Sequence, residues 1–163
     1  FLQDCKKIFI LHFSHNFLFN LNQFLIMKKK ALFLDDFRIP LDVIHYTRDE
    51  ALHVLYIEEN WEIVRNYEEF KKHIKSYGIP DLISFDHDLA HEHYSPLMYA
   101  NARAYNALYK TFKEKTGYHA AKWLKSYLKR KGLQMPEIHC HSQNPIGKNN
   151  ILKVFNVPLS NNT

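Results

Sequence analysis

Polar side chains that could carry out acid–base or metal chemistry gather at three places in the chain. Each place directly follows a short segment that is predicted to be a strand. Carboxylates, imidazoles and a hydroxyl in one pocket would suit a hard cation such as Mg²⁺ (or Mn²⁺) together with a phosphate group. The three groups are Asp35-Asp36, then Asp86-His87-Asp88, and last His141, Ser142 and Asn144.

The residue types in these groups suggest separate roles. Several carboxylates in one pocket repel one another unless a cation neutralises them, so Asp35, Asp36 and Asp86 are the predicted metal ligands. Asp86 could serve as a ligand or as a nucleophile, and His87 or His141 could carry a proton near neutral pH. A metal ion held there could polarise a phosphoryl group. The indicated chemistry is a metal-assisted reaction at a phosphate ester.

A second set of residues is suited to holding an anion. Ser142 and Asn144 could donate hydrogen bonds to phosphate oxygens, and a helix starting near Gly147-Lys148 would offer backbone N–H groups and a cation. An aspartate at a strand end is often only a turn or cap residue, but three such groups at successive strand ends favour a site. The predicted substrate-binding residues are Arg38, Asp88, Ser142, Asn144, Gly147 and Lys148.

The elements that must position these residues alternate between strand and helix. Strands are predicted at 31–34, 61–65, 82–85 and 137–140. Helices are predicted at 47–56, 67–77, 97–114, 118–131 and 148–155. This alternation indicates an α/β three-layer sandwich with a short parallel sheet of four to five strands. Ligands of such sheets bind outside the carboxyl ends of the strands, which is where the polar groups lie.

Composition narrows the class of protein. With 46% hydrophobic and 24% charged residues, the 163-residue chain is suited to a folded domain and not to disorder. Two cysteines exclude a disulfide-rich secreted scaffold, so the expected location is the cytoplasm. The net charge of +5 is spread along the chain, and sequence-specific DNA binding is not expected. The chain has no glycine-rich phosphate loop or dinucleotide fingerprint, which argues against P-loop chemistry and NAD binding.

Residues 1–26 differ from the rest of the chain. They are rich in Phe, Leu and Ile, but polar residues interrupt the apolar run too often for a membrane span or a signal peptide. We expect this segment to be a non-native upstream extension or a disordered tail. Residues 27–163 are then a single domain, and no membrane partner is expected.

Four motifs, in this order, are similar to those of the cyclic-phosphate processing receiver-like family of bacteria and phages. The resemblance covers roughly residues 31–155, nearly the whole chain after Met27. The motifs are Leu32-Phe33-Leu34-Asp35-Asp36-Phe37-Arg38-Ile39-Pro40, then Ile83-Ser84-Phe85-Asp86-His87-Asp88-Leu89, then Thr116-Gly117-Tyr118 with Ala121-Lys122-Trp123-Leu124, and last His141-Ser142-Gln143-Asn144-Pro145-Ile146-Gly147 with Asn150-Ile151.

The resemblance implies a fold like that of response-regulator receivers and flavodoxin. It implies that Asp35 and Asp36 are the acidic pair that holds Mg²⁺. Asp86 would be the phosphoacceptor position, and Ser142 the hydroxyl residue after the fourth strand. One departure is that no clear fifth strand and helix, with the lysine of a signalling receiver, follow the fourth strand; Lys148 could supply that charge from another direction.

The resemblance also implies action on, or recognition of, cyclic-phosphate ends of nucleotides or RNA. The expected function is Mg²⁺-dependent binding and hydrolysis of such a phosphate ester, and the residues do not decide between an enzyme and a sensor. The alternative is a non-enzymatic receiver, phosphorylated on Asp86, that signals to a partner. A haloacid-dehalogenase-like phosphatase, from Asp86-x-Asp88, and an RNA-binding module with a basic surface also stay open. No oligomeric state is predicted.

Overall fold

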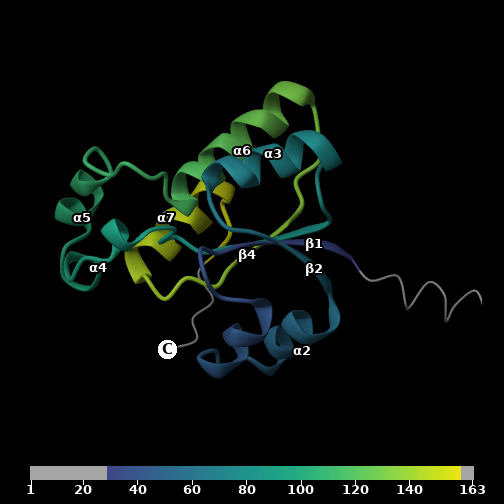
Figure 1. The fold of residues 1–163 in the computed structure, drawn as a ribbon, viewed down its shortest axis with the longest axis horizontal. Helices are drawn as coiled ribbons and strands as arrows, with labels where there is room; N and C mark the ends of the chain where they lie inside the picture. The colour runs from purple at the N-terminus through teal and green to yellow at the C-terminus, as the bar shows by residue number, and fades with distance from the viewer. Residues whose placement is uncertain (1–28, 159–163) are drawn as a thin grey trace, which may run out of the picture.

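A single parallel sheet with helices on both faces organises the chain (Figure 1). The structure is a computed structural model, and it describes residues 29–158. The expectations for residues 1–26 therefore lie outside the described part of the chain.

The sheet has the four strands that were predicted from the sequence. They are β1 (Lys30–Leu34), β2 (Asn60–Val64), β3 (Leu82–Phe85) and β4 (Glu137–Cys140). The strands are all parallel and follow the order β2-β1-β3-β4. In the register of the sheet, Leu34 at the end of β1 lies opposite Val64 on one side and Phe85 on the other. The predicted α/β receiver-like fold is confirmed, with β1 and β3 at the centre.

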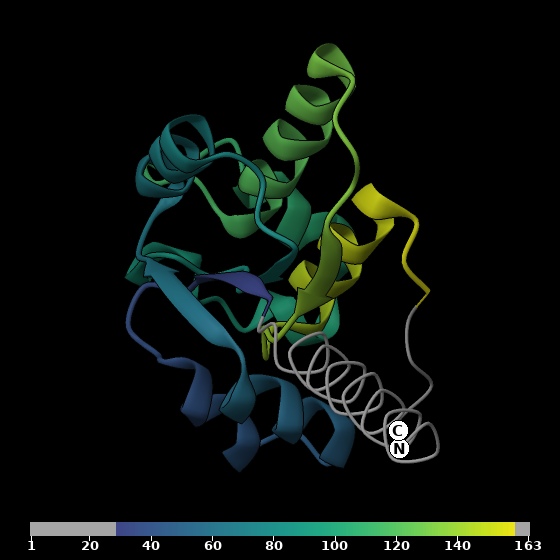
Figure 2. The same ribbon diagram turned by 90° about the vertical axis from the view of Figure 1, so that its right-hand side faces the viewer.

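Helices cover the sheet in two layers. The 3-10 helix η1 (Pro40–His45) and α2 (Glu50–Glu58) lie on one face, and α3 (Tyr67–Tyr77), α6 (Gly117–Lys131) and α7 (Pro145–Phe155) lie on the other (Figures 1 and 2). Between β3 and α6 the chain forms η2 (His91–His93), α4 (Leu97–Ala100) and α5 (Ala102–Leu108), which project from one end of the molecule.

Alternating side chains of β1 divide the core. Leu32 and Leu34 pack into the larger apolar cluster with residues of α3, α6 and α7, whereas Phe33 packs with Val43 and Tyr56 on the opposite face. A strand buried on both faces is the expected partner of helices on both sides of a parallel sheet.

Several helix boundaries differ from their predictions. The predicted helix 97–114 is two short helices, because the backbone is extended at Asn101 and its side chain caps α5 by accepting from the Ala104 N–H at 3.0 Å. The last helix begins at Pro145 and not near Gly147, because Asn144 is its cap. The helix predicted over 47–56 runs from Glu50 to Glu58 after the cap Asp49.

Among the helices of residues 29–158, none combines the length and the apolar composition that crossing a bilayer requires.

Candidate functional site

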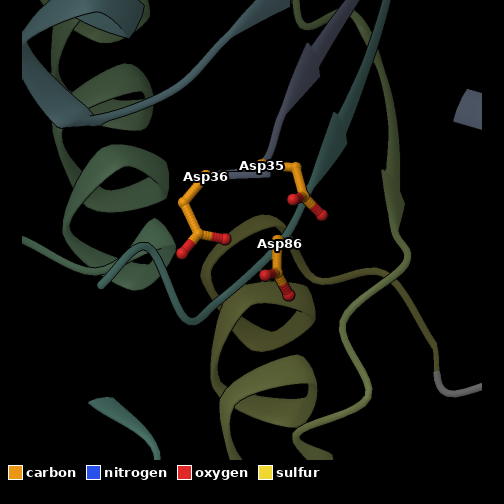
Figure 3. Close-up of side chains that lie close together, drawn as sticks. All are labelled: Asp35, Asp36 and Asp86. Carbon is orange, nitrogen blue, oxygen red and sulfur yellow. The ribbon is translucent and has the colours of Figure 1, made fainter. Parts of the chain in front are cut away.

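The candidate site lies at the carboxyl ends of the two central strands. Asp35 and Asp36 directly follow β1, and Asp86 directly follows β3 (Figure 3). From β1 the chain moves to β2 on one side of the sheet and then returns to β3 on the other side. Such a reversal of strand order opens a crevice at the strand ends, the usual binding place in this architecture.

Three carboxylates meet at this position. One oxygen of each of Asp35, Asp36 and Asp86 lies within 4.8 Å of the others. Asp35 and Asp86 are buried and Asp36 is half-buried. Oδ1 of Asp36 and Oδ2 of Asp86 are buried, and no group within residues 29–158 donates a hydrogen bond to either oxygen. Buried carboxylate oxygens without donors are costly, and a divalent cation bound by hard oxygen ligands would satisfy them.

Arg38 already supplies one positive charge to the carboxylates. Its Nε lies 2.7 Å from Oδ2 of Asp35, and one terminal nitrogen lies 2.8 Å from Oδ2 of Asp86. The contact to Asp86 is an ion pair without the alignment of a hydrogen bond. The other terminal nitrogen donates to the Tyr46 hydroxyl at 3.0 Å. Arg38, predicted to bind substrate, is therefore located between two of the predicted metal ligands.

The three carboxylates differ in how well their charges are satisfied. Oδ1 of Asp35 accepts from the backbone N–H groups of Phe37 at 3.0 Å and Arg38 at 2.6 Å. Burial acts to raise the pKa of Asp35, but the hydrogen bond from His141 and the charge of Arg38 outweigh it and hold this pKa below its usual range. Burial, together with the charges of Asp35 and Asp86, raises the pKa of Asp36 to about 6. Asp36 is thus the carboxylate whose charge is least stabilised.

His141 belongs to a chain of hydrogen bonds that ends on Asp35. Its Nε2 lies 3.2 Å from Oδ2 of Asp35, and its Nδ1 lies 2.7 Å from the Ser84 hydroxyl, which lies 2.6 Å from the Tyr56 hydroxyl. A carboxylate only accepts, so Nε2 carries the proton and Nδ1 accepts from Ser84. The ring is fully buried, stacks on Phe33 at 4.1 Å, and has its pKa lowered by burial. This chain fixes the position of the Asp35 carboxylate.

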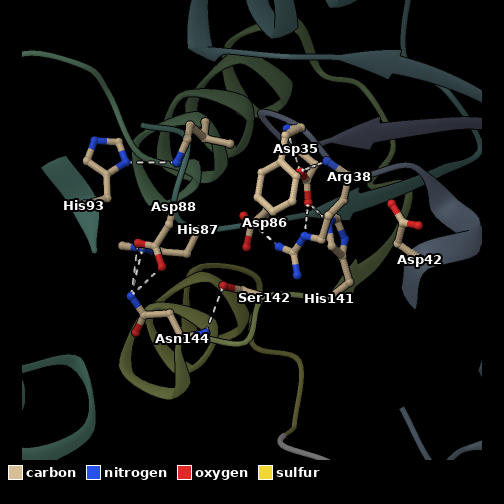
Figure 4. A network of polar contacts seen from close by, with 12 residues as sticks. Asp35, Arg38, Asp42, Asp86, His87, Asp88, His93, His141, Ser142 and Asn144 are labelled. Carbon is tan, nitrogen blue, oxygen red and sulfur yellow. Dashed lines mark hydrogen bonds and ion pairs between the residues drawn. The ribbon is translucent and has the colours of Figure 1, made fainter. Parts of the chain in front are cut away.

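His87 and Asp88 belong to a second buried network (Figure 4). His87 donates from Nδ1 to Oδ1 of Asp88 at 2.7 Å, and its Nε2 accepts from the Tyr109 hydroxyl at 2.9 Å. Asp88 also accepts from the Tyr105 hydroxyl at 3.0 Å and from the Asn144 amide, which lies 3.1 Å from both of its oxygens. Both oxygens of Asp88 therefore have hydrogen-bond donors, whereas Oδ1 of Asp36 and Oδ2 of Asp86 have none.

Asn144 links this second network to the start of α7. Its side-chain oxygen accepts from the Gly147 N–H at 2.9 Å, and its backbone N–H donates to the Ser142 hydroxyl at 3.2 Å. The N–H of Lys148 donates to the Asn144 carbonyl at 2.8 Å. The helix N–H groups predicted to hold an anion at Gly147-Lys148 are thus engaged within the protein. Gly147 is required here because a Cβ atom would lie 2.2 Å from Cγ of His87.

The structure sorts the predicted site residues into these two networks. Asp35, Asp36, Asp86, Arg38 and His141 come together at the ends of β1, β3 and β4. A second network, attached to α5 and α7, holds His87, Asp88, Asn144, Ser142 and Gly147. Five further side chains complete the networks and were not singled out from the sequence, where isolated tyrosines and serines give no signal: Tyr46, Tyr56, Ser84, Tyr105 and Tyr109.

Comparison with known proteins gives one match. A family model described as the cyclic-phosphate processing receiver domain matches residues 30–157, which include both networks. No curated protein and no solved structure gives a significant match.

Proposed function

Because the chain belongs to the cyclic-phosphate processing receiver domain family, we propose that it binds and hydrolyses a cyclic phosphate ester at Asp35, Asp36 and Asp86 with a divalent cation. The observation that carries this proposal is the cluster of three carboxylates, in which Oδ1 of Asp36 is buried without a hydrogen-bond partner and Oδ2 of Asp86 has only its ion pair with Arg38. The family supports chemistry at a phosphoryl group, and the proposal adds the hydrolysis, the cation and the residues.

The donor set favours Mg²⁺, or Mn²⁺ in its place. All of the available donors are carboxylate oxygens, and this is the ligand chemistry of hard divalent cations, which also bridge to phosphate oxygens. When bound, such a cation would polarise the phosphoryl group and neutralise the charge that develops on it. Asp36 would hold the cation through Oδ1 and Asp86 through Oδ2, the two oxygens without hydrogen bonds. Arg38 and His141 would keep the Asp35 carboxylate in place.

Hydrolysis of the ester needs a water molecule and a proton transfer. The water oxygen bonds to phosphorus, one ring P–O bond breaks, and the released oxygen takes a proton, which leaves an acyclic monoester. His87 and His141 are the predicted proton carriers, but both rings are buried and each ring nitrogen has a partner inside the protein. Either histidine would have to break a hydrogen bond to reach a substrate, so we assign them first to positioning Asp88 and Asp35.

Phosphorus-31 NMR of the full chain with Mg²⁺ and a panel of cyclic nucleotides tests this function. We expect the resonance of one cyclic ester to be replaced by that of a monoester, and we expect EDTA to stop the conversion. Line broadening without turnover would instead make the protein a sensor of the ligand. The receiver alternative predicts a labile acyl phosphate on Asp86 after treatment with a small phosphodonor. A panel with neither turnover nor broadening would contradict the proposal.

Stabilisation by Mg²⁺ should depend on pH because of Asp36. Its pKa rises from the usual 3.8 to about 6 in the folded protein, so the metal-free fold holds this proton more tightly than the unfolded chain does. The Asp36 carboxyl therefore contributes stability to the metal-free protein that is lost as pH rises from about 4 to about 6. Burial lowers the pKa values of His93, His119 and His141, and these histidines contribute in the opposite direction, so the effect of Asp36 is measured against a variant without its carboxyl. Thermal unfolding should show a larger Mg²⁺-dependent increase in Tm at about pH 7.5 than at about pH 5, since protons compete with the cation.

The Asp36→Asn variant is the control for this pH dependence. Asn cannot ionise, so the metal-free variant should be at least as stable as the native protein above about pH 6 and should lose the pH-dependent part of the Mg²⁺ effect. An equal Mg²⁺ effect at both pH values in the native protein would show that Asp36 does not titrate in this range.

A further inference from the structure

Charge is distributed very unevenly along the described chain, which corrects the expectation that the positive charge is spread along it. Residues 29–99 contain 14 Asp or Glu against 8 Lys or Arg, whereas residues 100–158 contain 2 against 11. The overall charge of +5 conceals this difference. This difference in charge between the two halves exceeds what solubility requires. A region of a protein whose charges have mostly one sign attracts a partner of opposite charge.

The sheet order places the basic half at one edge of the sheet. This half builds β4, α6 and α7, whereas the acidic half builds β1, β2 and β3 with η1, α2 and α3. The two halves meet where α3 packs against α6, with the centres of the Phe70 and Trp123 rings 6.2 Å apart. Figure 2 shows α6 and α7 in green and yellow on the side of the molecule away from α2. α6 itself has no acidic residue. We call its exposed basic side chains and the lysine just before it the α6 basic surface: Lys115, Lys122, Lys125, Lys129, Arg130 and Lys131.

The α6 basic surface begins at the candidate site. The N–H of Gly117, the first residue of α6, donates to the carbonyl of His87 at 2.8 Å. A Cβ atom on Gly117 would lie 1.8 Å from the carbonyl oxygen of Asp86, so α6 starts in direct contact with the backbone that carries this carboxylate. From there its 15 residues extend over about 22 Å. A polyanion lying along α6 would reach the carboxylate site with one end.

Aromatic rings accompany the lysines at the start of α6. The amino group of Lys122 lies 5.3 Å from the centre of the Tyr118 ring, which stacks on Tyr109 at 5.4 Å. Tyr118 is half-buried. Lysines with interleaved aromatic rings are the usual means of binding single-stranded nucleic acid, because phosphates contact the cations and bases stack on the rings.

We propose that the α6 basic surface binds a single strand of RNA whose terminal cyclic phosphate lies at Asp36 and Asp86. This inference rests on the proposed function and narrows its substrate to a polynucleotide end, in place of a free cyclic nucleotide. The partner is RNA because only a ribose has the neighbouring 2′ and 3′ hydroxyls that close a cyclic phosphate at the end of a strand. Its backbone supplies the regularly spaced negative charges that a run of cations along one helix can contact.

Fluorescence anisotropy with a short labelled RNA that ends in a 2′,3′-cyclic phosphate tests the proposal on the full chain. The titration is made in EDTA, so that it reports on the α6 basic surface and not on a cation-bound end of the RNA. The test variant replaces Lys122 and Lys129 with Gln. The control replaces Lys30 and Arg48 with Gln, which removes the same charge from exposed positions on neither α6 nor its neighbour α3. We expect the test variant to bind RNA at least about tenfold more weakly, and its salt-dependence slope to fall by about 1.4, since each lost phosphate contact contributes about 0.7 for a single strand.

The controls distinguish failure of this surface from failure of the proposed function. Equal losses in the test variant and the control, or a native salt slope near zero, would overturn the RNA surface. Heparin of similar charge that binds as tightly as the RNA would overturn the assignment to RNA. Turnover of a cyclic mononucleotide by ³¹P NMR should be unchanged in the test variant. If the native protein binds the RNA in this way but converts no cyclic ester, RNA binding by the α6 basic surface is supported and the proposed hydrolysis is contradicted.

Discussion

Replacement of Asp86 by Asn should lower turnover of the cyclic phosphate at least about a hundredfold, the usual cost of removing one preorganised electrostatic group from a site. Asp86 is 1% exposed, and its Oδ2 is one of the two buried carboxylate oxygens without a hydrogen-bond partner. The amide has nearly the same shape but no charge. Its effect on a cation-dependent reaction should therefore exceed its effect on packing.

Two measurements separate the site from the fold in the Asp86→Asn variant. We expect ³¹P NMR to show little or no conversion, and thermal unfolding to show a much smaller Mg²⁺-dependent increase in Tm. Asp49→Asn is the matched control, because Asp49 caps α2 through its side-chain oxygen and Asn caps helices equally well. An Asp86→Asn variant with native turnover and a native response to Mg²⁺ would remove Asp86 from the proposed chemistry.

Replacement of Gly117 by Ala should destabilise the fold by about 3 kcal/mol or more, the upper end of the range for overpacking. The added Cβ would lie 1.8 Å from the Asp86 carbonyl oxygen and 2.9 Å from its carbonyl carbon. Both are backbone atoms, and neither can rotate away as a flexible side chain would. The start of α6 and the end of β3 would have to separate, which would also move Asp86.

Gly132→Ala is the control for this prediction. Gly132 ends α6 with a φ of 63° and has open space around the position of a Cβ atom. Its substitution should cost only about 1–2 kcal/mol, the price of a left-handed backbone for a residue with a side chain. Chemical denaturation of both variants measures the difference. A Gly117→Ala variant no less stable than Gly132→Ala would mean that α6 and β3 can separate easily.

The acidic part of the site could be predicted from the sequence. Asp35-Asp36 and Asp86 follow apolar runs that can only be buried parallel strands, and the carboxyl ends of such strands meet at one edge. No three-dimensional information was needed to bring these three residues together. The sequence could not show that Asp88 lies apart from these three carboxylates, in the network of His87 and Asn144. Side chains that follow a strand leave its regular alternation, and the local turn decides where each one points.

The hydrogen-bond partners of His87 could not be predicted from the sequence either. Tyr105 and Tyr109 reach His87 and Asp88 because α5 folds back beside the sheet, and α5 exists as a separate helix only through the cap at Asn101. Periodicity over 97–114 reads as one continuous helix and places neither tyrosine. The difference in charge between the two halves can be counted in the sequence, but the overall charge of +5 does not show it.

The contact of Arg38 with two of the clustered carboxylates has a consequence for how the protein matures. In domains whose metal ion is the main source of folding free energy, the chain without metal is unfolded and a chelator denatures it. Here the guanidinium acts as a built-in counter-ion, at 2.7 Å from Asp35 and 2.8 Å from Asp86. We therefore expect the chain to fold without the proposed cation, so that a chelator would stop the proposed reaction and leave the protein folded.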